Sequence, residues 1–327
     1  MTAALAIDLF LALLVLGIAV YTGAARSTYS AVVAFVGYGV VVSLIWVRLA
    51  APDVALTEGA IGSGLTGVLL LTAAARMRAL DATPEAAPPA LLRLAAGLLA
   101  IVVTAALVLA VLHLPEPAPT LAHAARDNLA VTGVGNPVTA TLMAFRGTDT
   151  FLEKVVLVFA LVGVWSLAKN ADWGGRPGPR HSADPQGALA FLARLLPPLG
   201  LVIGVYLLWN SADHPGGAFQ GGTVLAAMWL LAIMARLADT PAIAGRVLRL
   251  SLLIGPAIFL IVGLAGAWFG DGFLAYPPAI AKPVILAIEV PMTLTIAVTL
   301  ALLMTGAPER VAASDERDAA EAGEGAR

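Results

Sequence analysis

The sequence predicts an all-α, polytopic membrane protein with about nine transmembrane helices and one short helix that does not span. Hydrophobic residues make up 60% of the chain and charged residues 12%, about half of the charge that a soluble domain carries. The apolar runs are also about 20 residues long, the length that a helix needs to cross about 30 Å of hydrocarbon.

Nine runs are long enough to span, and each begins or ends near Gly, Pro or charged residues. They are Ala3–Tyr21, Ser30–Leu49, Val54–Ala75, Leu91–Leu112, Phe151–Ala168, Leu189–Trp209, Phe219–Leu237, Val247–Phe269 and Val284–Met304. The sixth is the weakest, because Arg194 and Pro197–Pro198 interrupt it. Another apolar stretch, Val138–Phe145, is too short to cross, so we expect a half-helix or an interfacial helix there.

Lysine and arginine orient the predicted spans. With nine spans, the odd-numbered loops and the C-terminal tail hold fourteen of these residues, and the opposite side holds five. Because cytoplasmic loops carry the excess of positive charge, we expect an external N-terminus and a cytoplasmic C-terminus. Linkers rich in Pro, Gly or charge, at residues 78–92 and 172–187, divide the spans into groups of three, two and four, and residues 306–327 have the composition of a disordered tail.

Composition excludes several kinds of site. The chain has no cysteine, four scattered histidines and a net charge of −2, which argues against disulfides, thiolate metal sites and a nucleic-acid partner. We find no nucleophile set, zinc motif or phosphate loop. We therefore expect no metal, no cofactor and no enzymatic activity in this chain.

The third span carries two carboxylates near its start, Asp53 and Glu58. Asp53 either caps the helix or serves an ion pathway. Glu58 either benefits from the positive end of the helix dipole or serves the pathway, and we favour the pathway because it lies more than one turn inside, where burial raises its cost without helping a cap. Four small residues recur every four positions and predict close contact with a neighbouring helix. They are Ala55, Gly59, Ser63 and Gly67.

The last span carries Glu289 about one and a half turns inside, followed by Pro291. Proline cannot donate to the carbonyl of Ala287, so a polar backbone group is left free beside the carboxylate, as in the broken helices of transporters. The alternative is a plain kink in which Glu289 pairs with Lys282, two turns away on the same face.

Two external segments are also candidates. Arg146, Asp149, Glu153 and Lys154 form a charged cluster at the entrance to the fifth span, although surface ion pairs of this kind usually contribute little. The glycine-rich loop 213–222 precedes the seventh span and is either an anion cradle or a tight turn that brings backbone close to another subunit. We prefer the turn, with Gln220 as a packing or hydrogen-bonding residue.

Three motifs resemble subunits of one group of membrane complexes. Ala51–Leu65, A-P-D-V-A-L-T-E-G-A-I-G-S-G-L, resembles the C-terminal module of the MrpA antiporter subunit, which corresponds to MbhD of membrane-bound hydrogenases. Phe145–Glu153, F-R-G-T-D-T-F-L-E, resembles the MbhE-like module that follows it. His214–Gly222, H-P-G-G-A-F-Q-G-G, resembles the signature of MrpB/MnhB and MbhF, with Ala218 where the family commonly has glycine.

The resemblance implies an MbhD-like module at 1–80, an MbhE-like module at 88–170, an MrpB/MnhB-like module at 188–306 and a disordered tail at 307–327. It implies a subunit of a multi-subunit Na⁺/H⁺ antiporter in a prokaryotic cell membrane, with other Mrp-type subunits as partners. One alternative is the membrane arm of an energy-converting hydrogenase or complex-I-like redox complex. The other is a purely structural subunit.

Within this family Glu58 would be the titrating carboxylate and Asp53 its companion. The predicted ion-pathway residues are Asp53, Glu58, Asp149, Glu153, Lys282 and Glu289. The predicted interface or structural residues are Arg146, Lys154, Gly216, Gly217, Gln220, Gly221 and Gly222.

Overall fold

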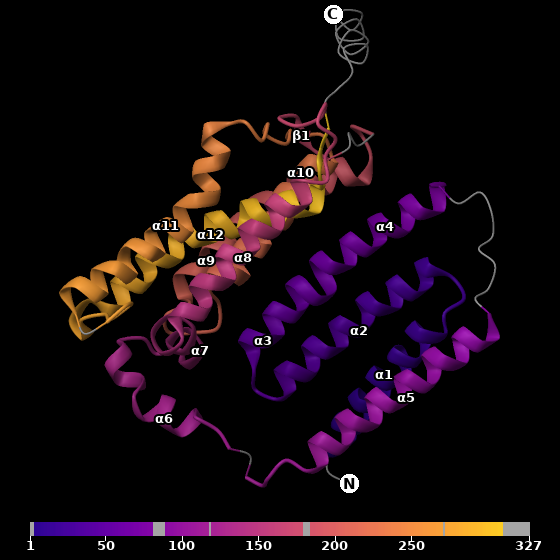
Figure 1. The fold of residues 1–327 in the computed structure, drawn as a ribbon, viewed down its shortest axis with the longest axis horizontal. Coiled ribbons are helices and arrows are strands. Elements are labelled where there is room, and N and C mark those ends of the chain that lie inside the picture. Colours follow the sequence, from indigo (N-terminus) through magenta and orange to yellow (C-terminus); the bar gives the residue numbers. More distant parts are fainter. Residues whose placement is uncertain (1–2, 81–88, 118, 179–183, 271, 310–327) are drawn as a thin grey trace, which may run out of the picture.

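A computed structural model describes residues 3–80, 89–117, 119–178, 184–270 and 272–309 as a bundle of helices (Figure 1). The predicted linker at 78–92 and the predicted tail lie partly outside these residues. The tail prediction is wrong at its start, because β2 (Pro308–Glu309) pairs antiparallel with β1 (Arg176–Pro177). This two-residue ladder ties the end of the last helix to the loop before α9.

The first module contains three long helical segments. α1 (Ala3–Ala24) packs on α2 (Thr28–Arg48), whose N-terminus is capped by Ser27. The third segment is interrupted: α3 (Pro52–Thr57) continues into a π-helix, η1 (Glu58–Leu65), and then into α4 (Thr66–Leu80).

The predicted strip of small residues faces α2, which confirms the prediction of close helix contact. Gly39 lies against Ser63, so that a β-carbon on Gly39 would stand 2.8 Å from the Ser63 β-carbon. The Ser43 hydroxyl donates to the carbonyl of Ala55 at 2.8 Å. Small side chains thus let the two backbones approach within the membrane.

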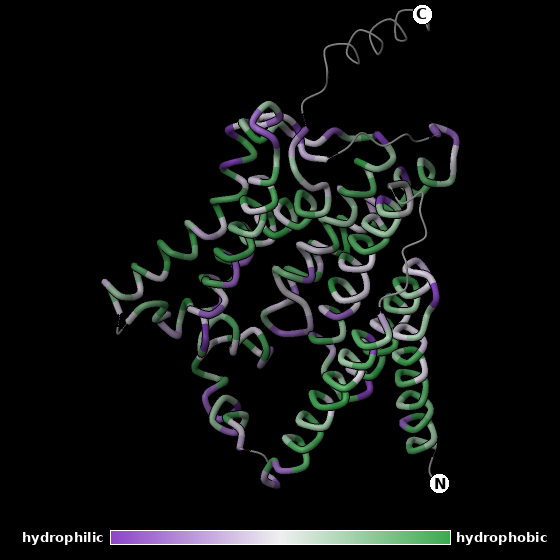
Figure 2. Tube along the Cα trace, turned by 45° about the vertical axis from the view of Figure 1, so that its right-hand side comes forward, coloured by the Kyte–Doolittle hydropathy of each residue, from purple (hydrophilic) through white to green (hydrophobic). Residues whose placement is uncertain are grey.

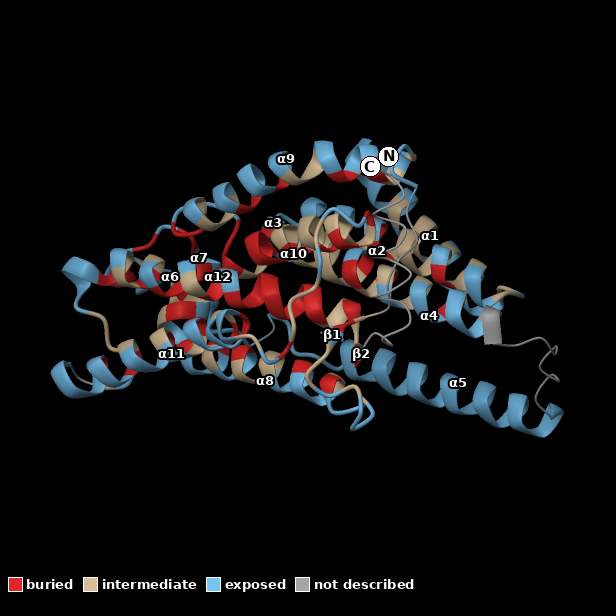
Figure 3. Cartoon of the chain, turned by 90° about the horizontal axis from the view of Figure 1, so that it is seen from above, coloured by how far each residue is buried: buried red, intermediate tan, exposed pale blue. Residues whose placement is uncertain are grey.

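The second module starts with α5 (Ala90–Leu112), which is exposed along its whole length (Figure 3). Four shorter elements follow and lead into the long helix α8 (Gly147–Trp165). They are α6 (Ala122–Asp127), η2 (Leu129–Thr132), α7 (Pro137–Ala140) and the π-helix η3 (Thr141–Phe145). α7 and η3 form the short helical segment that the sequence predicts at 138–145.

The third module contains four helices and most of the core. They are α9 (Ala188–Asn210), α10 (Ala218–Met234), α11 (Arg246–Phe269) and α12 (Ala281–Thr305), the last preceded by the short η4 (Pro278–Ile280). α10 packs on both α9 and α12, and α12 is the most buried helix (Figure 3). The main core joins this module to residues of the other two, among them Leu65 and Met143.

Each predicted span coincides with a helical segment, and hydrophobic residues dominate these helices (Figure 2). Seven of the described segments are long and apolar enough to cross a membrane. The two others are α10, which has 17 residues, and α8, which carries three charged side chains in its first half. α9 is one continuous helix of 23 residues although Pro197 and Pro198 lie inside it.

Candidate functional site

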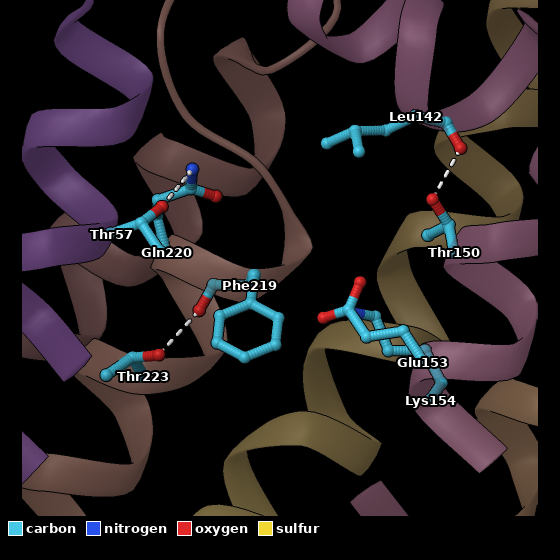
Figure 4. A network of polar contacts seen from close by, with 8 residues as sticks. All are labelled: Thr57, Leu142, Thr150, Glu153, Lys154, Phe219, Gln220 and Thr223. Atoms are coloured by element: carbon cyan, nitrogen blue, oxygen red, sulfur yellow. Dashed lines mark hydrogen bonds and ion pairs between the residues drawn. The ribbon is translucent and has the colours of Figure 1, made fainter. Parts of the chain in front are cut away.

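A cavity of about 200 Å³ lies where the three modules meet, and it holds most of the buried charge of the described chain. Its ionisable lining residues are Glu153 and Lys154 from α8 and Glu289 from α12. Figure 4 shows the α8 pair facing Phe219 of α10, with Gln220 and Thr57 beyond that ring. A larger groove of about 530 Å³ between α1 and α2 has no charged lining residue, so it offers no site for ion chemistry.

Glu289 is the most enclosed carboxylate of this site, with 5% of the residue exposed. The Ser211 hydroxyl donates to its Oε2 at 2.5 Å, and the backbone amide of Ala218 in the first turn of α10 also faces it. Amides at a helix N-terminus favour a negative charge. The alternative in which Glu289 pairs with Lys282 is wrong, because Lys282 pairs with Asp213.

Lys154 is the cation of the cavity and is 4% exposed. Its Nζ lies 2.8 Å from Glu153 Oε1 and 4.2 Å from the centroid of the Phe219 ring, and it also interacts electrostatically with Glu289. A buried ammonium needs such partners, because an unpaired charge in an apolar environment is very costly.

The loop between α9 and α10 connects the site to the first module. Gly216 donates its backbone amide to Asp53 Oδ1 at 2.9 Å, and Gln220 donates to Thr57 Oγ1 at 3.2 Å. α3 has no side-chain cap, so the capping alternative for Asp53 is wrong. Gly216 and Gly217 have φ values of 150° and 151°, which strongly favour glycine.

The second module holds the same loop from the other side. Asn136 donates its side-chain amide to the carbonyl of His214 at 2.9 Å, and Thr139 donates to the carbonyl of Ser211 at 2.7 Å. The tight turn is therefore clamped between two other modules of the same chain. Backbone amides at this loop do bind anionic groups, as the anion-cradle alternative expects. Among the described residues these groups are the carboxylates of Asp53 and Glu289.

Comparison with known families identifies two of the modules. Residues 13–79 match the MbhD family model, which describes one of the subunits of MBH, and residues 188–307 match that of the domain related to the MnhB subunit of Na⁺/H⁺ antiporter. The chain is an Mrp/Mnh-type subunit with an MbhD-like and an MnhB-like module. The MbhE-like assignment of residues 88–170 falls between the two matches and stays a prediction.

Solved structures share the fold. A chain of the Mrp complex from Dietzia sp. DQ12-45-1b matches with a TM-score of 0.72 and 24% identity, over 92% of this chain and 35% of that chain. The archaeal membrane-bound sulfane sulfur reductase matches with a TM-score of 0.51 and 22% identity, over 66% of this chain and 99% of that chain. An uncharacterized protein of Methanocaldococcus jannaschii is 28% identical over 43% of this chain and 60% of its own length.

Four of the six predicted ion-pathway residues do not line the cavity of this Mrp/Mnh-type subunit, and one of these, Asp53, lies beside it on the Gly216 amide. Glu58 begins the π-helix of the MbhD-like module, half-buried against Gly62, and has no hydrogen bond or ion pair with the other described residues. Asp149 is exposed and pairs with Arg146. Lys282 is half-exposed and its Nζ lies 2.6 Å from Asp213 Oδ2, and this contact holds the pKa of the Asp213 carboxyl below its ordinary value.

Gly221 and Gly222 lie inside the MnhB-like module, where they permit close packing of its helices. A β-carbon on Gly221 would stand 2.6 Å from the carbonyl oxygen of Gly204 in α9, and one on Gly222 would stand 2.8 Å from Ile296 in α12.

Sequence reasoning missed the hydroxyl and amide groups that hold the site. The Asn136–Pro137 pair is a helix-start signal, and Asn136 does cap α7, but Ser211, Thr57 and Thr139 carry no comparable signal. The sequence assigns Lys154 to an interface, whereas in the structure this residue lines the cavity.

Proposed function

We propose that this chain is a membrane-arm subunit of a hetero-oligomeric monovalent cation/proton antiporter, and that the cavity of the three modules is part of its ion pathway. In this proposal the chain is a transporter subunit and not an enzyme. The observation that carries it is Glu289, a carboxylate buried inside α12 and facing a cavity that also contains Glu153 and Lys154.

The cost of burying these charges supports a functional role. Glu289 lies eight residues from the start of α12, which is about 12 Å along the helix axis. Acidic side chains at membrane depth cost about 2.5–3.5 kcal/mol on insertion scales and generally mark ion or proton paths. A cavity of this size has room for about six water molecules at about 30 Å³ each. Hydrated carboxylates of this kind can accept and release protons.

The family matches support the setting. Both matched modules belong by name to Na⁺/H⁺ antiporter or membrane-bound hydrogenase subunits, and the Mrp complex shares the fold over most of this chain. The chain covers only 35% of that Mrp chain, so the ion exchanged and the partner subunits belong to the proposal.

A redox complex is the second candidate. The sulfane sulfur reductase chain aligns over 99% of its length with this chain, so the same fold also occurs in a respiratory membrane complex. In that setting the redox centres would lie in other subunits, and the same cavity would couple proton movement to electron transfer.

The decisive variant is Glu289→Gln, which keeps the size of the side chain and one acceptor oxygen but removes the ionisable group. We expect cation/proton exchange by the reconstituted complex to fall about a hundredfold, the scale of losing one proton-transfer group, while the complex still assembles. Glu116→Gln, at an exposed position after α5, is the control and should exchange normally. Full exchange by Glu289→Gln would remove the cavity from the pathway.

A further inference from the structure

Lys154 shares the cavity with two carboxylates that differ in exposure. The Glu153 side chain is 50% exposed and the Lys154 side chain 5%, whereas Glu289, which comes from α12, is buried. Lys154 contacts Glu153 in this structure and interacts electrostatically with Glu289 as well. One ammonium therefore serves two carboxylates.

The charges of the cavity do not balance when both carboxylates are ionised. Glu153, Lys154 and Glu289 are its ionisable lining residues, and Asp53 lies behind Gly216 on the α3 side with its own backbone donor. Two negative charges then face one positive charge. The cavity accordingly has room for one additional positive charge, either a proton on Glu289 or a monovalent cation.

We propose that Lys154 changes partner across the cavity, pairing with Glu153 when Glu289 carries a proton and with Glu289 when it is ionised. This inference rests on the proposed function, because it assigns a positioning role within the same ion pathway. When Glu289 becomes ionised, Lys154 leaves its ion pair with Glu153. The charge state of the buried carboxylate is thereby linked to the pairing of Glu153, whose side chain is half-exposed.

The surroundings of Lys154 suit such a movement. Its ammonium is a compact charge on a flexible four-carbon stem, unlike the planar guanidinium of arginine. The Phe219 ring, whose centroid lies 4.2 Å from Nζ in the same cavity, offers the ammonium a further favourable contact. A buried, ionised Glu289 with only neutral partners would cost much free energy. The Lys154 ammonium therefore moves to Glu289 when this carboxylate is ionised.

Glutamine variants of the α8 pair distinguish a moving lysine from a fixed ion pair. In the purified complex, Lys154→Gln should lower exchange about a hundredfold, because Glu289 loses its cation. If Lys154 only neutralised Glu153, the double variant Glu153→Gln/Lys154→Gln would restore exchange. We expect the double variant to remain as impaired as Lys154→Gln alone, and restoration to the wild-type rate would overturn the proposal.

The single variant Glu153→Gln supplies a second readout and, being half-exposed, leaves the core intact. With Glu153 neutral, Lys154 should stay with Glu289 and favour its ionised form, which moves the pH of half-maximal exchange downward. An unchanged pH profile would overturn the proposal. Lys154→Arg keeps the charge and should recover part of the exchange that Lys154→Gln loses.

Matched controls separate this inference from the proposed function. Arg176→Gln/Asp239→Asn removes another ion pair, in which both side chains are exposed, and should leave rate and pH profile unchanged. Exchange that survives Glu289→Gln refutes the proposed pathway itself. Exchange that is lost in Glu289→Gln but restored in the α8 double variant refutes only the partner change of Lys154.

Discussion

The Glu289 carboxylate meets a hydroxyl, a helix N-terminus and an ammonium, each from a different segment of the chain. None of these three partners lies in α12, the helix that carries Glu289. The carboxylate is therefore stabilised only when α8, α10 and the loop before α10 are assembled around α12. This dependence makes the site a junction of modules.

The Asp213–Lys282 pair offers a test of the charges outside the cavity. Lys282 lowers the pKa of Asp213, so the pair stabilises the folded chain above the ordinary pKa of 3.8 and loses that effect as pH falls below it. Both side chains are about half exposed. We expect Lys282→Met to reduce the free energy of unfolding at pH 7 by about 0–1 kcal/mol.

Thermal unfolding followed by tryptophan fluorescence checks this prediction, and the difference between variant and parent should shrink progressively as the pH falls below 3.8. A difference that does not shrink on acidification would contradict the ion-pair explanation. If Lys282→Met strongly lowered exchange, this result would instead support the sequence-based prediction that Lys282 belongs to the ion pathway.

At this scale the sequence identifies the costly residues but not their partners. Glu289, Glu153 and Asp53 are recognisable as carboxylates at or near apolar runs, and all three lie in or beside the cavity. Lys154 and Glu289 are 135 positions apart, and no local pattern joins them. Glu58 has the same sequence signal as Glu289, yet it lies outside the cavity.

At the scale of elements, the start of α10 decides where the site forms. Gly216 donates to Asp53, and a β-carbon on Gly216 would stand 2.3 Å from the carbonyl oxygen of Leu207. Gly216→Ala should therefore shift the turn and cost about 1–3 kcal/mol. We expect a lower unfolding temperature of the complex and reduced exchange. Gly163→Ala, in open surroundings on the exposed side of α8, is the matched control and should behave like the parent.

The lengths of the helices follow from the sequence, whereas their irregularities do not. Apolar runs predict each spanning segment, because a membrane helix must be apolar over its whole length. The π-helices η1 and η3 carry no such signal, and Pro197–Pro198 do not break α9. These features depend on how neighbouring helices accept the freed backbone groups.

At the scale of the whole molecule, the three modules differ in how much of their surface this chain covers. α12 is largely buried, while the described residues of α1 and α5 are not buried at any position. Two apolar helices that no other part of the described chain encloses must meet lipid or other subunits. The MnhB-like module is thus the core of the subunit, and its partners are expected beside α1 and α5.

Gentle purification of the complex through this chain, followed by mass spectrometry, tests the proposed assembly. We expect large antiporter-like membrane subunits to co-purify, because the chain has Mrp/Mnh-type modules but covers only part of the matched Mrp chain. Co-purifying iron–sulfur or hydrogenase subunits would contradict the antiporter proposal. The cavity would then couple proton movement to electron transfer in other chains, and Glu289→Gln should uncouple the two processes in the same way that it should stop exchange in an antiporter.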